Sequence, residues 1–192
     1  MSQAFAFLPE SPPRVTLAAF MAMKDDGGSR KELVDGRVYA MAPGTVRHAG
    51  IANNFGTALN NRLKPPCWAL AQAGLIASPT ADHYLVPDVV VSCTPAGPND
   101  LWVRNPRVVV EVLSPSTLTH DRGAKLPLFR AMPTVRAIFL VSSDAPRVEA
   151  WHRAETHWVV LELEGLDAEI RVDEPELVVP MREIYRGVFD VT

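Results

Sequence analysis

The sequence predicts an α/β fold in which a central mixed sheet is flanked by helices. Two observations carry this prediction. Along the chain, helical segments alternate irregularly with strands, in the order helix, hairpin, helix, strands, helix, strands. The segment 107–113 is almost continuously apolar, which is typical of a strand buried on both faces. With 192 residues, of which 47% are hydrophobic and 21% charged, the chain can bury one substantial core.

The N-terminal third predicts an arm, a helix and a hairpin. We expect a flexible, proline-rich arm over 1–15, followed by a single domain over 16–192. Thr16 can cap a short helix that Gly27-Gly28 would end. The segment "KELVDGRVYAMAP" then predicts two short strands joined at Asp35-Gly36, a strong hairpin signal.

A second, amphipathic helix is predicted from His48 up to Pro65-Pro66. Its apolar stripe consists of Ile51, Phe55, Ala58, Leu59 and Leu63. A third helical segment is expected at 118–132, and the tail is expected to form a strand and a short helix. The remaining segments predict strands at 67–72, 75–79, 86–93, 107–113, 137–143, 147–153 and 157–164.

Composition narrows the function classes. A net charge of −3 argues against strong non-specific nucleic-acid binding over the whole surface, although it leaves room for a local basic groove. No GxSxG, Walker or GxGxxG motif occurs. Cys67 and Cys93 stand apart without a CxxC, so we expect buried small apolar residues and no disulfide. No membrane span and no secretion signal is found, which predicts a cytoplasmic protein.

Glu111 is unusual because it interrupts the valine-rich strand "VVVEVL". Strand alternation places it on one face with Val109 and Leu113. A carboxylate in such a place requires compensation. Asp88 begins a second valine-rich strand, "PDVVVS". A divalent metal shared by the two acids would supply the positive charge, and magnesium suits one or two carboxylates with water and phosphate. A structural ion pair between Glu111 and an arginine is an equally good explanation from spacing alone.

The Pro-Asp at 87–88 followed by the acid of "EVL" resembles the PD-(D/E)XK nuclease superfamily. Five ordered blocks between about residues 30 and 155 extend the match. Together they are similar to the Uma-type endonuclease family, a branch of the restriction-endonuclease-like fold. The blocks are "KELVDGRVYAMAPGTVRH", "VPDVVV", "VVVEVLSPST", "DRGAKLPLFRAM" and "AIFLVSSDAPRVEAWHR".

The resemblance implies roles for particular residues. Asp88, Glu111 and the backbone carbonyl of Val112 would bind Mg²⁺, with Mn²⁺ as a possible substitute, and metal-bound water would attack a phosphodiester of DNA. The superfamily places a lysine two residues after the acid, where this chain has Leu113. The Uma-type pattern instead implies a lysine from the following helix, here Lys125.

Asp121 and Lys125 lie four residues apart, on one face if the segment is helical. Spacing alone favours an exposed, nearly neutral ion pair, whereas the resemblance makes Lys125 catalytic and Asp121 its partner or a helix cap. Pro127 requires either a helix that starts near Asp121 or a kink.

Glu32 and His48 also occupy positions of the family pattern. Glu32 would hold a metal-bound water, and His48 would contact phosphate or transfer a proton. A solvated carboxylate and a surface histidine are the ordinary alternatives. The other histidines, His83, His120, His152 and His157, indicate surface or satisfied core roles. The tryptophans Trp102, Trp151 and Trp158 are expected to pack in the core or at a subunit contact rather than to stack on bases. The arginines Arg104, Arg107, Arg122 and Arg130 either contact phosphate or are solvated surface residues.

Taken together, the sequence predicts a restriction-endonuclease-like core with an N-terminal helix and hairpin, acting as a magnesium-dependent DNA endonuclease. Two other interpretations stay open. One is a catalytically silent module that binds nucleic acid or a protein partner; the other is a structural or regulatory homodimer that kept the acids for stability. Nucleases of this fold often act as homodimers, and the strands at 147–164 are the expected contact.

Overall fold

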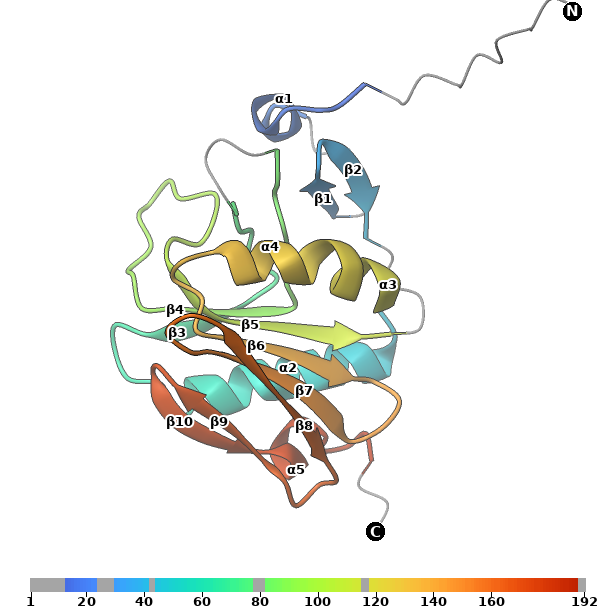
Figure 1. The fold of residues 1–192 in the computed structure, drawn as a ribbon, viewed down its shortest axis with the longest axis vertical. Coiled ribbons are helices and arrows are strands. Elements are labelled where there is room, and N and C mark those ends of the chain that lie inside the picture. The colour runs from blue at the N-terminus through green and yellow to red at the C-terminus, as the bar shows by residue number, and fades with distance from the viewer. Residues whose placement is uncertain (1–12, 24–29, 42–43, 78–81, 115–117, 190–192) are drawn as a thin grey trace, which may run out of the picture.

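The computed structural model describes residues 13–23, 30–41, 44–77, 82–114 and 118–189. Its centre is a six-stranded sheet in the order β3-β4-β5-β6-β7-β8 (Figure 1). The strands are β3 (Trp68–Ala71), β4 (Val89–Ser92), β5 (Pro106–Leu113), β6 (Ala137–Ser142), β7 (Arg147–Arg153) and β8 (Trp158–Glu164). Strands β5 and β6 are parallel and the other neighbours antiparallel, so the predicted mixed sheet is confirmed.

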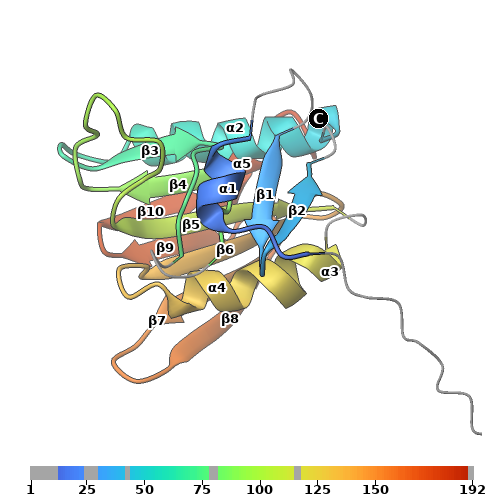
Figure 2. The same ribbon diagram turned by 90° about the horizontal axis from the view of Figure 1, so that it is seen from above.

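Helices cover both faces of this sheet (Figure 2). Helix α2 (Val46–Asn60) covers one face, together with α5 (Met181–Ile184) and the hairpin of β9 (Glu169–Asp173) and β10 (Glu176–Pro180). The other face packs against α4 (Leu126–Ala131), which follows α3 (Leu118–His120) and a π-helical turn, η1 (Asp121–Lys125). The hairpin of β1 (Lys31–Val34) and β2 (Arg37–Ala40) lies beside these, and α1 (Leu17–Met21) precedes it in the chain.

Most local signals form the structures that were predicted. Thr16 accepts a hydrogen bond from the backbone N–H of Ala19 and caps α1, while Gly27-Gly28 lies outside the described residues. Asp35 and Gly36 both have positive φ, as a tight hairpin turn requires. Helix α2 begins two residues before His48, and Ile51 and its stripe are buried under the sheet.

Some elements differ from the prediction. Of the strand expected at 75–79, the described residues form a single bridge between Leu75 and Leu85. Strand β9 was not predicted, although its alternation of charged and apolar residues is that of a half-buried strand. Residues 1–12 of the predicted arm lie outside the described residues, and Val15 donates a backbone hydrogen bond to Gly36.

The prediction for the two cysteines was wrong. Cys67 and Cys93 form a disulfide, and both are half-buried rather than buried. The antiparallel register pairs Trp68 with Ser92, which brings the flanking cysteines together at the end of the β3–β4 ladder. They are 26 residues apart in the sequence, so no local spacing rule could indicate the bond.

The two edge strands of the sheet, β3 and β8, differ in what covers them. At β3, the side chain of Asn60 donates to the Ala69 carbonyl at 3.0 Å and accepts from the Ala69 N–H at 2.8 Å. This amide therefore takes the place of a further strand. At the opposite edge, β8 exposes three consecutive apolar side chains, Val159, Val160 and Leu161, each 40% to 50% exposed.

Candidate active site

The candidate site is centred on Glu111, which lies within the buried strand β5. As predicted, Glu111 is on the same face as Val109 and Leu113, both of which pack in the cluster under α4. Only 3% of Glu111 is exposed. Burial raises the pKa of this carboxyl well above its ordinary value, because the charged form loses its water. Lys125 opposes the rise, and the charge of Asp88 adds to it.

Lys125 lies at the centre of a group of acids. Its Nζ is 2.6 Å from Glu111 Oε1, 2.9 Å from Glu32 Oε1 and 3.6 Å from Asp121 Oδ1. The lysine is 2% exposed, so the exposed ion pair that spacing alone favoured is wrong. Burial acts to lower the pKa of Lys125, but Glu111, then Glu32 and Asp121, raise it above its ordinary value. The ammonium is therefore held in the charged form, and the cation beside Glu111 is a lysine rather than an arginine.

A π-helical turn explains how Lys125 reaches this position. The backbone N–H of Leu126 donates to the carbonyl of Asp121, five residues back, which widens the turn by one residue. Asp121 and Lys125 are both buried on its inner side. Pro127 follows in the first turn of α4, where a missing N–H costs little. Of the two arrangements considered for Pro127, the helix that tolerates it early is the one formed, with a π-turn before it.

Asp88 is oriented by the neighbouring strand and by helix α2. Its Oδ2 accepts a hydrogen bond from the backbone N–H of Val112 at 2.8 Å and lies 3.2 Å from His48 Nε2. The bond to Asp88 raises the pKa of His48, and although burial opposes this, the Val112 backbone adds to the rise. His48 is thus brought to Asp88, and the Val112 backbone lies beside both.

Glu32 joins the same group from strand β1. Its Oε1 accepts from the backbone N–H of Val86 at 2.7 Å, and its Oε2 lies 3.7 Å from His120 Nε2. Burial acts to raise the pKa of Glu32, but contacts with His120, Lys125 and Val86 together hold it below its ordinary value. Glu32 is 2% exposed, so it is not the solvated carboxylate that was the ordinary alternative.

His120 is a member of the site that sequence reasoning missed. It was assigned a surface or core role, yet its ring packs on Tyr39 at 4.5 Å between centroids and its Nε2 faces Glu32. This nitrogen is buried and has no hydrogen-bond partner among the described residues. The only sequence signal was its position next to Asp121, because the contact with Glu32 depends on how the hairpin packs on η1.

We call Glu32, Asp88, Glu111, Asp121 and Lys125 the acid–lysine cluster. It sets four carboxylates against one ammonium, with two histidines beside them, so negative charge is in excess. No three His, Cys, Asp or Glu side chains in the described part of the chain converge as a ready chelating group. Magnesium, however, binds through one or two carboxylates and fills its other positions with water and phosphate. The oxygen donors of Asp88, Glu111 and Val112 fit such an ion.

The cluster is enclosed. Its five members are 2% to 6% exposed, whereas the side chains of His48 and His120 are 16% and 26% exposed. The two histidines therefore stand between the cluster and solvent. Of the arginines named from the sequence, Arg122 pairs with Glu149 at 2.5 Å and Arg104 with Asp100 at 2.6 Å.

The family follows from a match that spans most of the chain. The family model described as "Uma2: Putative restriction endonuclease" matches residues 17–182. The chain belongs to the Uma2 family. This membership confirms the resemblance drawn from the five sequence blocks and makes a nuclease the expected activity class.

The chain is also similar to known proteins in sequence and in structure. "Uncharacterized protein slr1290" of Synechocystis sp. (strain ATCC 27184 / PCC 6803 / Kazusa) is 29% identical over 95% of this chain and 98% of its own length. "Uncharacterized protein sll1609" of the same organism is 23% identical over 81% and 91%. A crystal structure from Anabaena variabilis, described as "a putative nuclease belonging to DUF820", superposes with a TM-score of 0.68 at 20% identity. That match covers 89% of this chain and 97% of the other. The fold is thus the restriction-endonuclease-like one that was predicted.

Proposed function

We propose that this member of the Uma2 family is a metal-dependent endonuclease that hydrolyses phosphodiester bonds in DNA. The observation that carries the proposal is the position of Lys125, whose ammonium lies 2.6 Å from Glu111 in a strand that also orients Asp88. Stability alone does not explain a buried lysine surrounded by acids, because apolar side chains of similar volume in place of such ion pairs usually give a protein that is at least as stable.

Lys125 would do the work of the lysine that other PD-(D/E)XK nucleases carry on the strand. Leu113 occupies that strand position and packs in the apolar cluster under α4. The ammonium of Lys125 would hold the attacking water, or neutralise charge on the phosphate. Glu32 and Asp121 would keep it charged and in place, because both lie within 4 Å of its Nζ.

The metal would be held by Asp88, Glu111 and the carbonyl of Val112. When bound, Mg²⁺ or Mn²⁺ supplies Lewis-acid stabilisation of the negative charge that develops on the phosphate. The bond from the Val112 N–H fixes the carboxylate of Asp88. His48, partly exposed and bonded to Asp88, would contact phosphate or donate a proton to the leaving oxygen.

Cleavage of supercoiled plasmid DNA with Mg²⁺ or Mn²⁺ tests the proposal. We expect nicking by the wild type and a loss of at least about 100-fold in Glu111→Gln and Asp88→Asn, the range typical of removing a catalytic charge. Asp167→Asn is the matched control, because this carboxylate is 93% exposed and pairs only with an exposed arginine. Melting curves of each variant establish that it is folded. Equal nicking by all four proteins would exclude these catalytic roles.

A second candidate function is a catalytically silent module of the same fold, favoured by the burial of the cluster. Five side chains at 2% to 6% exposure leave little room for a phosphodiester to enter. Mn²⁺ binding followed by electron paramagnetic resonance separates the two. An active site should bind Mn²⁺ in the wild type and lose it in Glu111→Gln, whereas a silent module should bind none.

We also propose that two copies associate through β8, as the strands at 147–164 were expected to do. This edge of the sheet exposes Val159, Val160 and Leu161, and an edge strand with consecutive apolar side chains readily pairs with another strand. A second copy offers an identical strand in antiparallel orientation. Light scattering should give a dimer for the wild type and a monomer for Leu161→Lys. A wild type that stays monomeric up to its solubility limit would rule this contact out.

We propose that the protein acts in the cytoplasm, where a DNA substrate is available. No helix in the described ranges has the length and apolar character needed to cross a bilayer. Since most cytoplasmic thiols are reduced, Cys67 and Cys93 would be thiols there and would pair on oxidation. Thiol alkylation of rapidly quenched cells, followed by mass spectrometry, distinguishes the two states.

A further inference from the structure

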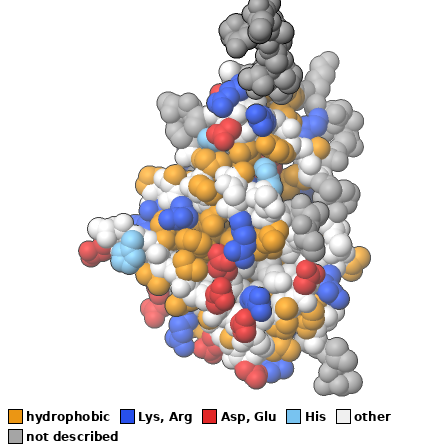
Figure 3. Space-filling view, turned by 45° about the vertical axis from the view of Figure 1, so that its right-hand side comes forward, with side chains coloured by type: hydrophobic (Ala, Val, Ile, Leu, Met, Phe, Trp, Pro, Cys, Tyr) orange, Lys and Arg blue, Asp and Glu red, His pale blue; other side chains and the backbone are white. Residues whose placement is uncertain are grey.

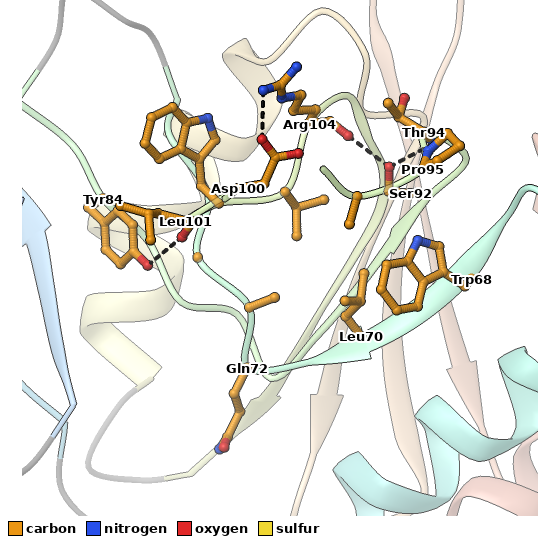
Figure 4. A pocket seen from close by; sticks show the side chains of 15 residues that line it. Trp68, Leu70, Gln72, Tyr84, Ser92, Thr94, Pro95, Asp100, Leu101 and Arg104 are labelled. Carbon is orange, nitrogen blue, oxygen red and sulfur yellow. Dashed lines mark hydrogen bonds and ion pairs between the residues drawn. The ribbon is translucent and has the colours of Figure 1, made fainter. Parts of the chain in front are cut away.

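A second concave region lies at the far end of β4 from the acid–lysine cluster. It is a pocket of about 330 Å³ between β3, the end of β4 and the loop that follows it (Figure 4). None of the residues that line it belongs to the cluster. A volume near the lower limit for ligand sites suits a small group rather than a large ligand. We call it the aromatic pocket, after Trp68, Tyr84 and Trp102 in its lining.

Two of the aromatic side chains of this pocket are much more exposed than side chains of the core. Trp68 and Trp102 are each 40% exposed, and the neighbouring Leu101 is 64% exposed. Trp102 was expected to pack in the core or at a subunit contact, and its exposure places it outside the core. Tyr84 is fixed in place: its hydroxyl donates to the carbonyl of Leu101 at 3.3 Å, and its ring lies against the backbone of Gly74, where any Cβ would collide with it. Such a surface is preformed for a flat apolar face.

The charges around the pocket are arranged so that its interior is neutral. Arg104 pairs with Asp100 at 2.6 Å, which neutralises the charged wall (Figure 4). On the rim, Arg30 donates to the side chain of Gln72. Because this partner is an amide, the contact does not cancel the guanidinium charge. The pocket therefore suits an uncharged planar ring, with an anionic group attached outside it.

A peptide added as a strand is a poor fit for this edge of the sheet. The backbone groups of Ala69 that face away from β4 are already bonded to the side chain of Asn60. Strand addition relies on free backbone groups of this kind. A nucleobase needs none of them, since stacking on aromatic rings provides the binding energy.

We propose that the aromatic pocket binds an unpaired nucleobase of the nucleic acid that the cluster is proposed to cut. This inference rests on the proposed function. The strand face that carries Glu111 packs in one apolar cluster with Leu70 and Val103, which also line the pocket, so the acid–lysine cluster and the pocket lie on the same face of the sheet. At about 3.3 Å per residue, Asp88 and Ser92 are roughly 13 Å apart. This equals about four nucleotides of a stacked strand at about 3.4 Å each. A base held there would require the substrate to be single-stranded or locally melted.

The face of the molecule drawn in Figure 3 agrees with recognition by stacking more than by charge. On the face drawn in Figure 3, basic and acidic side chains are interspersed and no basic stripe crosses it. Affinity for a strand would then depend on a few aromatic contacts, and binding would be less sensitive to salt than that of a strongly basic protein.

Binding measured without metal tests the inference separately from cleavage. The probe is a fluorescein-labelled ten-nucleotide single strand, titrated with the full chain in EDTA and followed by anisotropy. We expect Trp68→Leu and Trp102→Leu each to weaken binding by about 5- to 100-fold, since stacking contributes a comparable factor per base. Trp158→Leu is the matched control, because this tryptophan lies in β8 and contacts Arg153. Melting curves establish that all three variants are folded.

Four results would overturn the inference. One is equal binding of the strand by the wild type and both pocket variants, and a second is an equal loss of affinity when the same sequence is offered as a duplex. A third is displacement of the strand by a phenylalanine tripeptide, and a fourth is failure of excess adenosine monophosphate, which carries the same kind of base, to displace the strand. A protein that binds the strand through the pocket but never cuts it would refute the proposed nuclease and leave this inference standing. Cleavage with unchanged binding in the variants would refute the pocket alone.

Discussion

Replacing Lys125 with methionine removes the one ammonium that three buried acids contact. Methionine has nearly the same length as lysine and no charge, so packing is largely kept. Glu111, Glu32 and Asp121 would then face one another with their counter-charge gone. Removing one partner of a buried ion pair costs about 3 to 5 kcal/mol. In a domain of this size each kcal/mol lowers the melting temperature by about 2 to 4 °C, so we expect a fall of roughly 6 to 20 °C at pH 8.5.

The loss should depend on pH in a defined direction. The pKa of Glu111 is raised in the folded protein, and Lys125 acts to lower it, so in Lys125→Met it would rise further. Above the ordinary carboxyl pKa, the folded state then binds more protons than the unfolded state, and stability falls as pH rises. Lys125 in the wild type stays charged throughout, because its pKa is raised. The difference between the two proteins should therefore be smaller at pH 5 than at pH 8.5.

Thermal melts in EDTA at the two pH values measure this difference. Arg171→Met is the control, since Arg171 and Glu169 form an exposed pair at 71% and 48% exposure, and such pairs contribute less than about 1 kcal/mol. The double variant Lys125→Met, Glu111→Gln should recover part of the loss, because one uncompensated charge is gone. If Lys125→Met melts within about 2 °C of the wild type at both pH values, the reasoning from the buried ion pairs is wrong.

Three further predictions concern neighbouring features. In His48→Gln the loss of stability should be largest below pH 6.5 and should vanish as pH rises through the raised pKa of His48 beside Asp88, as urea melts across that range would show. Reducing the Cys67–Cys93 bond, which links residues 26 apart, should cost about 3 to 4 kcal/mol in urea melts with and without dithiothreitol, and Cys93→Ser should match the reduced protein. In Tyr185→Phe, the backbone N–H and carbonyl of Arg147 lose the hydroxyl that bonds both of them. Guanidinium melts should therefore show a free energy of unfolding lower by about 1 to 3 kcal/mol.

The sheet and the two strand acids could be predicted because their signals are local. An acid inside a valine-rich strand and a Pro-Asp before another are visible in the sequence, and the Asp35-Gly36 turn fixes its hairpin. Strand alternation was enough to place Glu111 on the face that the site uses. These features depend on the period of a strand and on turn chemistry alone.

The position of Lys125 could not be predicted from its spacing. Four residues from Asp121, it reads as one half of an exposed helical pair, and the family resemblance alone indicated a catalytic place. The structure shows that a π-helical turn, which has no sequence signature here, brings both side chains inside. His120 beside Glu32 depends on the packing of two distant segments, so it was missed for the same reason.

Because the Asn60 side chain completes one end of the sheet and β8 leaves the other end open, growth of the sheet by strand pairing can proceed in a single direction. Once two molecules meet through their open ends, each presents only a finished end to the surroundings. Under the proposed β8 pairing, assembly would stop at a closed pair, because at the other end Asn60 occupies backbone groups of Ala69 that a further strand would need.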